Sequence, residues 1–399
     1  MKHEIKNVVV INDFDYIQGG ASKVAIETAN LLKREYPQLN IYFFSGCTSN
    51  DNLLDNKIVN ISTEQGENLK DKNKIRGMIN GIYNFDAKNK LNKLLKTLNK
   101  DETIIHVHGW TKSLSCSIFD VIFKKKYKLV VTLHDYFTAC PNGGYFNYKK
   151  NDVCQLKALS TKCIMCNCDS RNYMFKIYRI IRQFVQNKVV KLNDKLKNVI
   201  FISEFSKKIL KNTLNKNINE YKLYNPIDYT IENKEIVNKK DYFVYVGRVS
   251  KEKGVENFCE VITETNTKGI VVGSGPELNK LKKIYNKIEF VGWKSTNDVK
   301  KYIKFAKALI FPSKWYETMG LTVVEALSLG TPVLVKNNTA AVEFVSNGKN
   351  GYVFNNKDEL KTYMNKMSNF KFYNDSHNLR KFNENIYVRE LYKIYDNIK

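Results

Sequence analysis

Short apolar runs alternate with amphipathic stretches along the chain, which is the pattern of a parallel sheet with crossover helices. In the first half, strands are expected at residues 8–13, 41–45, 58–62, 104–108, 129–134 and 199–203, with helical patterns notably at 21–35 and 88–98. A second series of strands is expected at residues 242–247, 269–272, 288–291, 308–311 and 332–335. The sequence therefore predicts an α/β protein of two doubly wound, Rossmann-like domains that face a central cleft, where ligands bind at the carboxyl ends of strands.

The pair Asn225-Pro226 interrupts this periodic pattern, because proline restricts the residue before it and breaks a helix. We place the domain boundary there, with an N-terminal domain at residues 1–225 and a C-terminal domain at residues 226–383. The last helical pattern, at residues 384–399, has no strand after it and is expected to pack back across the domains. A chain of 399 residues exceeds what one core usually supports, which agrees with two domains.

A helix expected to begin at Gly320 has two carboxylates near its start, Glu317 in the preceding loop and Glu325 within the helix. Strand-like runs flank it, so it is expected to be the crossover helix of a βαβ unit. The backbone N–H groups of Gly320 and Leu321 would point out of the helix and bind an anion. A phosphate on these amides, with ribose and sugar hydroxyls on the carboxylates, would form a nucleotide-sugar site. The alternative is a capped helix with two solvated acids.

Two further turns follow expected strands of the C-terminal domain. Arg248 and Lys253 would reach the cleft from the end of the first of these strands. The planar fork of arginine and the point charge of lysine suit a diphosphate whose negative charge grows as its bond breaks. Gly275 lies in another turn, where the backbone would pass close to a base or a sugar. A solvated basic turn and a simple glycine turn are the alternatives.

The N-terminal domain offers glycines and histidines at strand ends. Gly19 and Gly20 end the loop after the first strand, where missing side chains let backbone amides approach a phosphate or a sugar. His134 follows a strand and would bind a sugar hydroxyl or transfer a proton. The alternatives are a plain turn and a histidine bonded to the next aspartate. Of His106 and His108, one is expected in the core and the other near the cleft.

The chain is strongly basic, with 65 Lys and Arg against 40 Asp and Glu, a net charge of +25. Residues 1–225 hold 37 basic and 20 acidic residues (+17), and the remainder holds 28 and 20 (+8). Such an excess attracts nucleic acid, an anionic membrane surface or pyrophosphate-bearing substrates. No helix-turn-helix, zinc-finger or RNP-like pattern is visible, so no nucleic-acid partner is expected.

Residues 136–170 form a long stretch without clear periodicity, and a loop of that length needs something to hold it. It contains five of the eight cysteines: Cys140, Cys154, Cys163, Cys166 and Cys168. Cys163 and Cys166 have the C-x2-C spacing of metal ligands, and two of the others would complete a tetrahedral site. A structural zinc site, a cluster of buried thiols, and redox or iron–sulfur chemistry all remain open. The loop is expected to shape the acceptor side of the cleft.

The segment at residues 171–197 mixes aromatic and aliphatic residues with lysine and arginine. A basic amphipathic helix can pack its apolar face on the sheet or lie on an anionic membrane. We expect most of its apolar positions, which include Tyr173, Phe175, Tyr178 and Phe184, to pack on the sheet. The alternative, attachment to an anionic membrane, agrees with the charge of the first domain.

Taken together, these features resemble the family-4 retaining glycosyltransferases of the GT-B fold, also described as the group 1 type. The resemblance spans nearly the whole chain and is most specific at residues 320–335. The seven residues between Glu317 and Glu325 match the E-x7-E signature of that family. Four elements carry it in the expected order: Gly19 with Gly20, His134, Arg248 with Lys253, and Glu317 with Glu325.

The resemblance implies a role for each of these residues. Arg248 and Lys253 would hold the donor diphosphate, and Glu325 the ribose. Glu317 would bind the donor sugar together with the Gly320 and Leu321 amides, and His134 a sugar hydroxyl. Such enzymes are similar in keeping the anomeric configuration and in needing no catalytic metal.

Two departures from the family pattern concern the identity of the donor. Ser274 stands where these proteins often have an acidic residue. Thr339-Ala-Ala-Val-Glu343 replaces a glycine pair before Glu343.

The sequence thus predicts a hexosyltransferase that moves a sugar from a nucleotide diphosphate to a growing, lipid-linked surface polysaccharide of the capsule or O-antigen type. It is expected in the cytosol, peripherally attached to the inner face of the membrane. A nucleotide-sugar epimerase or a phosphorylase of the same fold is the alternative. An NAD-dependent oxidoreductase fits less well, because no G-x-G-x-x-G follows an expected strand.

Overall fold

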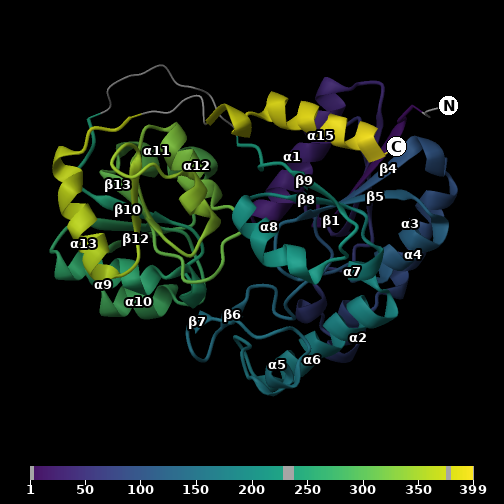
Figure 1. Cartoon of the computed structure of the whole chain (residues 1–399), viewed down its shortest axis with the longest axis horizontal. Helices are drawn as coiled ribbons and strands as arrows, with labels where there is room; N and C mark the ends of the chain where they lie inside the picture. The colour runs from purple at the N-terminus through teal and green to yellow at the C-terminus, as the bar shows by residue number, and fades with distance from the viewer. Residues whose placement is uncertain (1–3, 228–237, 374–378, 399) are drawn as a thin grey trace.

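The computed structural model describes residues 4–227, 238–373 and 379–398, which form two α/β domains side by side (Figure 1). The N-terminal domain contains a parallel sheet in the order β3-β2-β1-β4-β5-β8-β9. Its strands are β1 (Asn7–Phe14), β2 (Asn40–Cys47), β3 (Val59–Ser62), β4 (Thr103–Val107), β5 (Lys128–Leu133), β8 (Asn198–Phe201) and β9 (Asn219–Lys222). All eight residues of β1 are buried, as expected for the central strand of a sheet covered on both faces.

Helices cover both faces of this sheet. Buried residues of α1 (Gly20–Glu35) pack on one face, and buried residues of α3 (Phe85–Lys96), α4 (Ser117–Lys125) and α7 (Leu192–Lys195) pack on the other. Helix α8 (Glu204–Leu210) follows β8, and α2 (Lys74–Ile82) lies against α6 (Tyr173–Phe184). This layering confirms the predicted doubly wound fold.

The C-terminal domain has a six-stranded parallel sheet in the order β12-β11-β10-β13-β14-β15. Its strands are β10 (Phe243–Val246), β11 (Gly269–Val272), β12 (Glu289–Gly292), β13 (Ala308–Phe311), β14 (Val333–Lys336) and β15 (Gly351–Phe354). Its helices are α9 (Val255–Glu264), α10 (Leu278–Ile284), α11 (Thr296–Phe305), α12 (Leu321–Ser328) and α13 (Lys357–Lys366). The chain passes from one sheet to the other between β9 and β10, the segment where we place the domain boundary.

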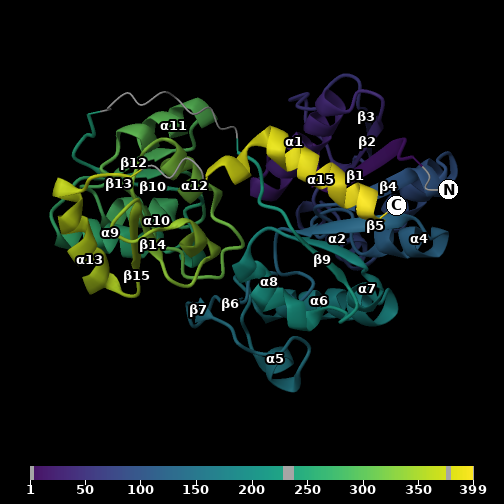
Figure 2. The same cartoon turned by 45° about the horizontal axis from the view of Figure 1, so that its top comes forward.

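The last helix, α15 (Glu384–Ile398), returns to the N-terminal domain and runs beside α1 (Figures 1 and 2). Its side chains Val388, Leu391 and Tyr395 are fully buried there. The Tyr395 hydroxyl is 2.7 Å from His106 Nδ1. The C-terminal end of the chain is therefore part of the N-terminal core.

Residues 136–170 contain only short elements, namely the hairpin β6 (Phe146–Asn147) and β7 (Asp152–Val153) and the helix α5 (Thr161–Met165). Helix α6 follows and ends in a π-helical turn (Val185–Val189). The left-handed backbone of Lys191, with φ of 59°, then separates this segment from α7. Residues 171–197 are therefore divided between α6, the π-helical turn and α7. None of the described helices combines the length and the apolar character needed to cross a bilayer.

Candidate functional site

A cleft of about 810 Å³ is lined by residues of both domains. Among the predicted site residues, it brings together Gly19 and Gly20 from the N-terminal domain and Arg248 from the C-terminal domain. Arg248 is exposed to the cleft. The remaining predicted residues lie outside its lining: His134, Lys253, Gly275, Glu317, Gly320, Leu321 and Glu325.

Glu317 and Lys253 form an ion pair beside the cleft. The Lys253 ammonium is 2.5 Å from Glu317 Oε1 and 5.0 Å from the centre of the Trp315 ring, which lines the cleft. Ser313 Oγ also donates to Glu317 Oε1 at 2.8 Å. Glu317 is only 7% exposed, so its carboxylate is held in one position before any ligand arrives.

Gly320 precedes α12, the crossover helix between the parallel strands β13 and β14. Its φ of 83° lies in the left-handed region, which favours glycine. A Cβ atom there would approach Ala341 Cβ to 2.9 Å. Gly275 is equally restricted, because a Cβ atom would collide with the carbonyl oxygen of Val249.

Glu325 on α12 faces the N-terminal domain. Lys23 of α1 lies 3.8 Å from Glu325 and 3.7 Å from Glu27. Burial raises the pKa of Glu27 to about 7, and the charge of Lys23 opposes that rise. Lys23 was not singled out in the sequence, although it lies one turn after Gly20, which lines the cleft.

The loop of Gly19 and Gly20 contacts the start of α12. A Cβ atom on Gly20 would lie 3.4 Å from Leu321 Cδ1. Ser22 Oγ accepts hydrogen bonds from the N–H groups of Gln18 and Gly19 at 2.8 and 3.1 Å, which fixes the loop. The two domains therefore meet at the glycines expected to face a ligand.

His106, His108 and His134 lie close together at the cleft and in the core behind it. His134 Nε2 is 2.9 Å from His108 Nδ1, and His106 bonds to Thr132 and Tyr395 in the core. Burial lowers the pKa of His134 to about 3, so the ring is neutral at physiological pH. His108 lines the cleft, and no described residue bonds to its buried Nε2. His106 is thus the core histidine, and His108 is the one near the cleft.

The cysteine loop gives the zinc prediction no support. Within the described residues, no three Cys, His, Asp or Glu side chains are placed to share a metal ion. This applies to all of the proposed ligands: Cys140, Cys154, Cys163, Cys166 and Cys168. Instead, the buried ammonium of Lys176 lies 3.5 Å from Cys163 Sγ and 3.2 Å from Cys168 Sγ. The Lys176 ammonium therefore occupies a position beside these thiols where a metal ion would have to bind.

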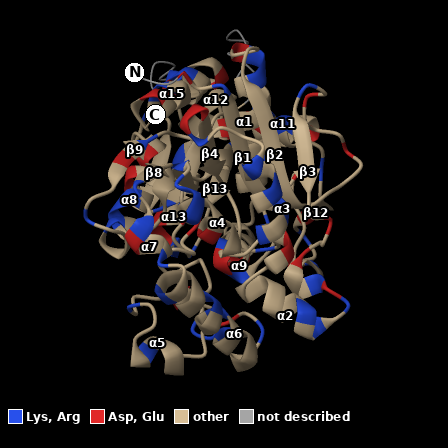
Figure 3. Ribbon diagram, turned by 90° about the vertical axis from the view of Figure 1, so that its right-hand side faces the viewer, with Lys and Arg blue, Asp and Glu red and all other residues tan. Residues whose placement is uncertain are grey.

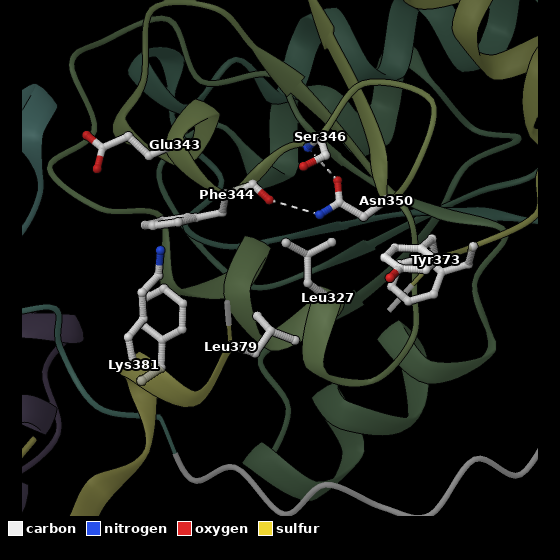
Figure 4. Close-up of a pocket in the computed structure, with 10 residues that line it drawn as sticks. Leu327, Glu343, Phe344, Ser346, Asn350, Tyr373, Leu379 and Lys381 are labelled. Atoms are coloured by element: carbon white, nitrogen blue, oxygen red, sulfur yellow. Dashed lines mark hydrogen bonds between the residues drawn. The ribbon is translucent and has the colours of Figure 1, made fainter. Parts of the chain in front are cut away.

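A second, much smaller cavity of about 70 Å³ lies in the C-terminal domain. Figure 4 shows its apolar side chains, which include Leu327 and Leu379, with the Glu343 carboxylate pointing away from them. That carboxylate accepts hydrogen bonds from the N–H groups of Glu204 and Phe205. Glu343 therefore joins the domains rather than lining the large cleft.

Comparisons with known proteins agree with this architecture. Residues 227–387 match the family described as glycosyl transferases group 1. An alpha-monoglucosyldiacylglycerol synthase from Acholeplasma laidlawii is 29% identical over 304 residues, which is 65% of this chain and 74% of that protein. An uncharacterized 42.6 kDa protein from the cps region of Klebsiella pneumoniae is 23% identical over 63% of this chain and 61% of its own.

Solved structures show the same fold. HepE from Anabaena in complex with UDP matches with a TM-score of 0.64 and 15% identity, over 98% of this chain and 100% of that one. Sucrose-phosphate synthase from Thermosynechococcus elongatus matches with a TM-score of 0.67 and 15% identity, over 98% and 99%. These likenesses show that the chain has the GT-B fold, and its residues 227–387 match the family of group 1 glycosyl transferases.

Proposed function

We propose that the protein is a retaining hexosyltransferase that uses a nucleotide diphosphate sugar as its donor. The observation that carries this proposal is the Lys253–Glu317 ion pair beside the cleft that Arg248 lines. A cation and a fixed carboxylate beside the cleft, with Arg248 in its lining, are suited to a sugar diphosphate. The likeness to HepE, which was solved with UDP and with UDP-glucose, supports a donor of this class.

Each predicted residue has a role in this proposal. Arg248 and Lys253 neutralise the diphosphate, and Glu325 binds the ribose. Glu317 binds the donor sugar, aided by the Gly320 and Leu321 amides. His134 contacts a sugar hydroxyl, and the small surfaces of Gly19, Gly20 and Gly275 let the backbone approach the donor closely.

Retention of configuration requires the incoming and leaving groups to share one face of the sugar. In this proposal the departing phosphate takes the proton of the acceptor, so no carboxylate nucleophile is needed. Asp135, which lines the cleft and whose pKa burial raises to about 6, is the group that an inverting enzyme would use as a base. The anomeric configuration of the product, read by NMR, decides between the two routes.

A panel of nucleotide sugars tests the donor site. A selective donor should raise the melting temperature of the wild type, because a ligand that binds only the folded state stabilises it. Glu317→Gln should lower kcat by at least about tenfold, since it removes a charged hydrogen-bonding group. The matched control is Glu390→Gln on α15, whose carboxylate pairs with Lys393 on the surface. Equal activity of Glu317→Gln and the wild type would refute these roles.

The alternatives of the same fold give different products. A glycosyltransferase releases free nucleoside diphosphate only when an acceptor is present. An epimerase converts the nucleotide sugar without releasing the nucleotide, and a phosphorylase requires inorganic phosphate. Chromatography of the nucleotide products, with and without acceptor, separates the three activities.

We also propose that the acceptor is a lipid-linked glycan and that the enzyme binds the cytosolic face of an anionic membrane. Helix α2 buries only Gly77 and Gly81 and turns its large apolar residues outward. Figure 3 shows α2, α5 and α6 together at one end of the molecule. Their exposed apolar residues form what we call the α2–α6 surface: Ile75, Met78, Ile79, Ile164, Met165, Tyr173, Met174, Ile181 and Phe184.

This surface corrects part of the sequence prediction. Of the four aromatic residues expected to pack on the sheet, Tyr178 is buried, whereas Tyr173 and Phe184 are exposed by 36% and 53%. An apolar surface of this extent on a basic domain suits an anionic lipid bilayer. The relative from A. laidlawii is, by its name, a glycolipid synthase, which agrees with a lipid acceptor.

Flotation with vesicles of equal parts phosphatidylglycerol and phosphatidylcholine tests the membrane proposal. A triple variant, Ile79→Ser, Met174→Ser and Phe184→Ser, should bind roughly a hundredfold more weakly, because each side chain contributes about 1 kcal/mol when it enters lipid. The control replaces Ile284 and Trp293, which are 55% and 75% exposed in the C-terminal domain, with serine. Wild-type protein that stays in the pellet would refute membrane attachment.

A further inference from the structure

Three cationic side chains come together where the N-terminal domain lines the cleft. Lys112 lies in the loop after β4, whereas Arg179 and Arg182 lie on α6. Because residues three apart share one face of a helix, both arginines of α6 point the same way. They lie on a different face of that helix from the exposed Ile181 and Phe184.

Arg182 is a buried cation, only 6% exposed. Its guanidinium donates to the carbonyl oxygens of Pro141 at 2.8 Å and Thr111 at 3.5 Å and lies over the Phe137 ring. Among the described residues, no carboxylate bonds to it. Burial and the charge of Arg179 lower the pKa of Arg182 to about 10. A buried charge of this kind is unfavourable unless an anion compensates it.

Lys112 lines the cleft, and in the described part of the chain no carboxylate lies within ion-pair distance of its ammonium. Burial first, and then the charges of Arg179 and Arg182, lower its pKa. The backbone N–H of Lys112 donates to Asp13 Oδ2 at 2.9 Å, which fixes the loop that carries it. Lys112 is therefore a second cation that, among the described residues, has no direct carboxylate partner, although the charges of Asp13 and Glu67 partly compensate it.

The neighbouring carboxylates are engaged elsewhere. Asp13 accepts hydrogen bonds from the N–H groups of Lys112, Ser113 and Leu114 and from the Ser113 hydroxyl. Asp169 lies 2.6 Å from Arg179 Nε. Asp135 interacts with both Lys112 and Arg182 through its charge, but its hydrogen bond is from the Phe137 N–H, so within the described residues neither cation is held by a direct carboxylate contact.

The charges of the residues that line the cleft also favour an anionic ligand on this side. From the N-terminal domain it is lined by six cations, Lys70, Lys112, Lys149, Arg171, Arg179 and Arg182, and four carboxylates, Asp13, Glu67, Asp135 and Asp169. From the C-terminal domain it is lined by Arg248 and Lys251 against Glu252 and Glu277. The excess of two positive charges thus lies wholly on the side opposite the proposed donor site. A phosphomonoester, which carries about −1.5 to −2 at pH 7, matches it.

We propose that the acceptor carries a phosphate group, and that Lys112 and Arg182 bind it while Arg171 and Lys149 attract it at the mouth of the cleft. This inference rests on the proposed function, because it assigns the acceptor half of the same cleft. The phosphate belongs either to a water-soluble sugar phosphate or to the headgroup of a lipid. Both present the same dianionic oxygens to an arginine fork and a lysine.

Binding of glucose 1-phosphate tests the site by calorimetry, after the donor site has been filled with the nucleoside diphosphate that binds most tightly. A second binding event is expected in the wild type. Lys112→Gln should weaken it by at least about tenfold, because it removes a charged hydrogen bond to the ligand. Lys70→Gln is the matched control, since Lys70 also lines the cleft but pairs with Glu67 at 2.5 Å. Arg182→Gln is a second variant of the site. If it does not fold, Arg171→Gln, at an exposed position, takes its place.

The outcomes separate the inference from the proposed function. A wild type that binds no nucleoside diphosphate refutes the proposed function itself. A wild type that binds the nucleotide but gives no second event, or a Lys112→Gln variant with unchanged affinity for glucose 1-phosphate, overturns only the phosphate site.

Transfer assays identify the source of the phosphate. One arm supplies glucose 1-phosphate in solution, and the other supplies a polyprenyl phosphate in vesicles. Either phosphorylated acceptor, used with a higher kcat/KM than free glucose, supports the site and names its source. Equal use of free glucose overturns it.

Discussion

Replacing Glu27 with glutamine should remove a pH-dependent loss of stability from the N-terminal domain. Burial raises the pKa of this carboxyl from 4.5 to about 7, even though Lys23 lies 3.7 Å away. The native state therefore keeps a proton that the unfolded state loses, and the free energy of unfolding falls as the pH rises from 4.5 to 7. A shift of this size corresponds to about 3 kcal/mol.

Urea unfolding at about pH 5 and about pH 8, followed by tryptophan fluorescence, measures this difference. Because the glutamine side chain cannot ionise, the Glu27→Gln variant should gain about 2–3 kcal/mol relative to the wild type between the two pH values. Other titrating groups are common to both proteins and cancel in the comparison. Glu390→Gln, at the exposed end of the surface pair with Lys393, should show no such change. A difference between Glu27→Gln and the wild type that does not depend on pH would refute the reasoning.

Two substitutions, one in α12 and one at the residue before it, should have different consequences. Glu325→Gln should weaken nucleoside diphosphate binding by about tenfold, since it replaces a charged hydrogen-bond acceptor for the ribose, while the melting temperature stays near that of the wild type. Unchanged affinity in a titration would contradict the role of Glu325. Gly320→Ala should instead lower stability by at least about 1 kcal/mol, because φ of 83° disfavours alanine and its Cβ would crowd Ala341. A Gly320→Ala variant with the melting temperature of the wild type would contradict this prediction.

The sheet could be predicted from the sequence because central strands of a parallel sheet are apolar throughout. Strand β9 was not predicted, because its residues Asn-Glu-Tyr-Lys are mostly polar. It lies at the edge of the sheet and pairs only with β8. Helix α2 was not predicted either, because its apolar residues face outward. It buries Gly77 and Gly81 and exposes Ile75 and Ile79, so its pattern does not indicate a core.

The candidate donor residues could be proposed because a local signature, two glutamates around a helix start, identifies them within ten residues of chain. Lys112 and Arg182 have no such signature. They lie 70 positions apart in the sequence and become neighbours only when α6 packs beside the loop after β4. In the sequence, Arg182 is one of several basic residues of an amphipathic segment, whereas in the structure it is buried and lines the cleft.

Helix α6 has two chemically different faces, and this arrangement links the membrane and acceptor proposals. Met174 and Phe184 are exposed by 68% and 53% on one side, while Arg179 and Arg182 line the cleft from the other. Helix α2 packs against α6 so closely that a Cβ atom on Gly81 would collide with the hydroxyl of Tyr178. If the α2–α6 surface rests on lipid, a phosphate attached to that lipid has only the width of one helix, about 10 Å, to cross before it meets the arginines. Part of the positive charge of the domain then lies on a helix that carries its arginines inward to a substrate rather than outward to solvent.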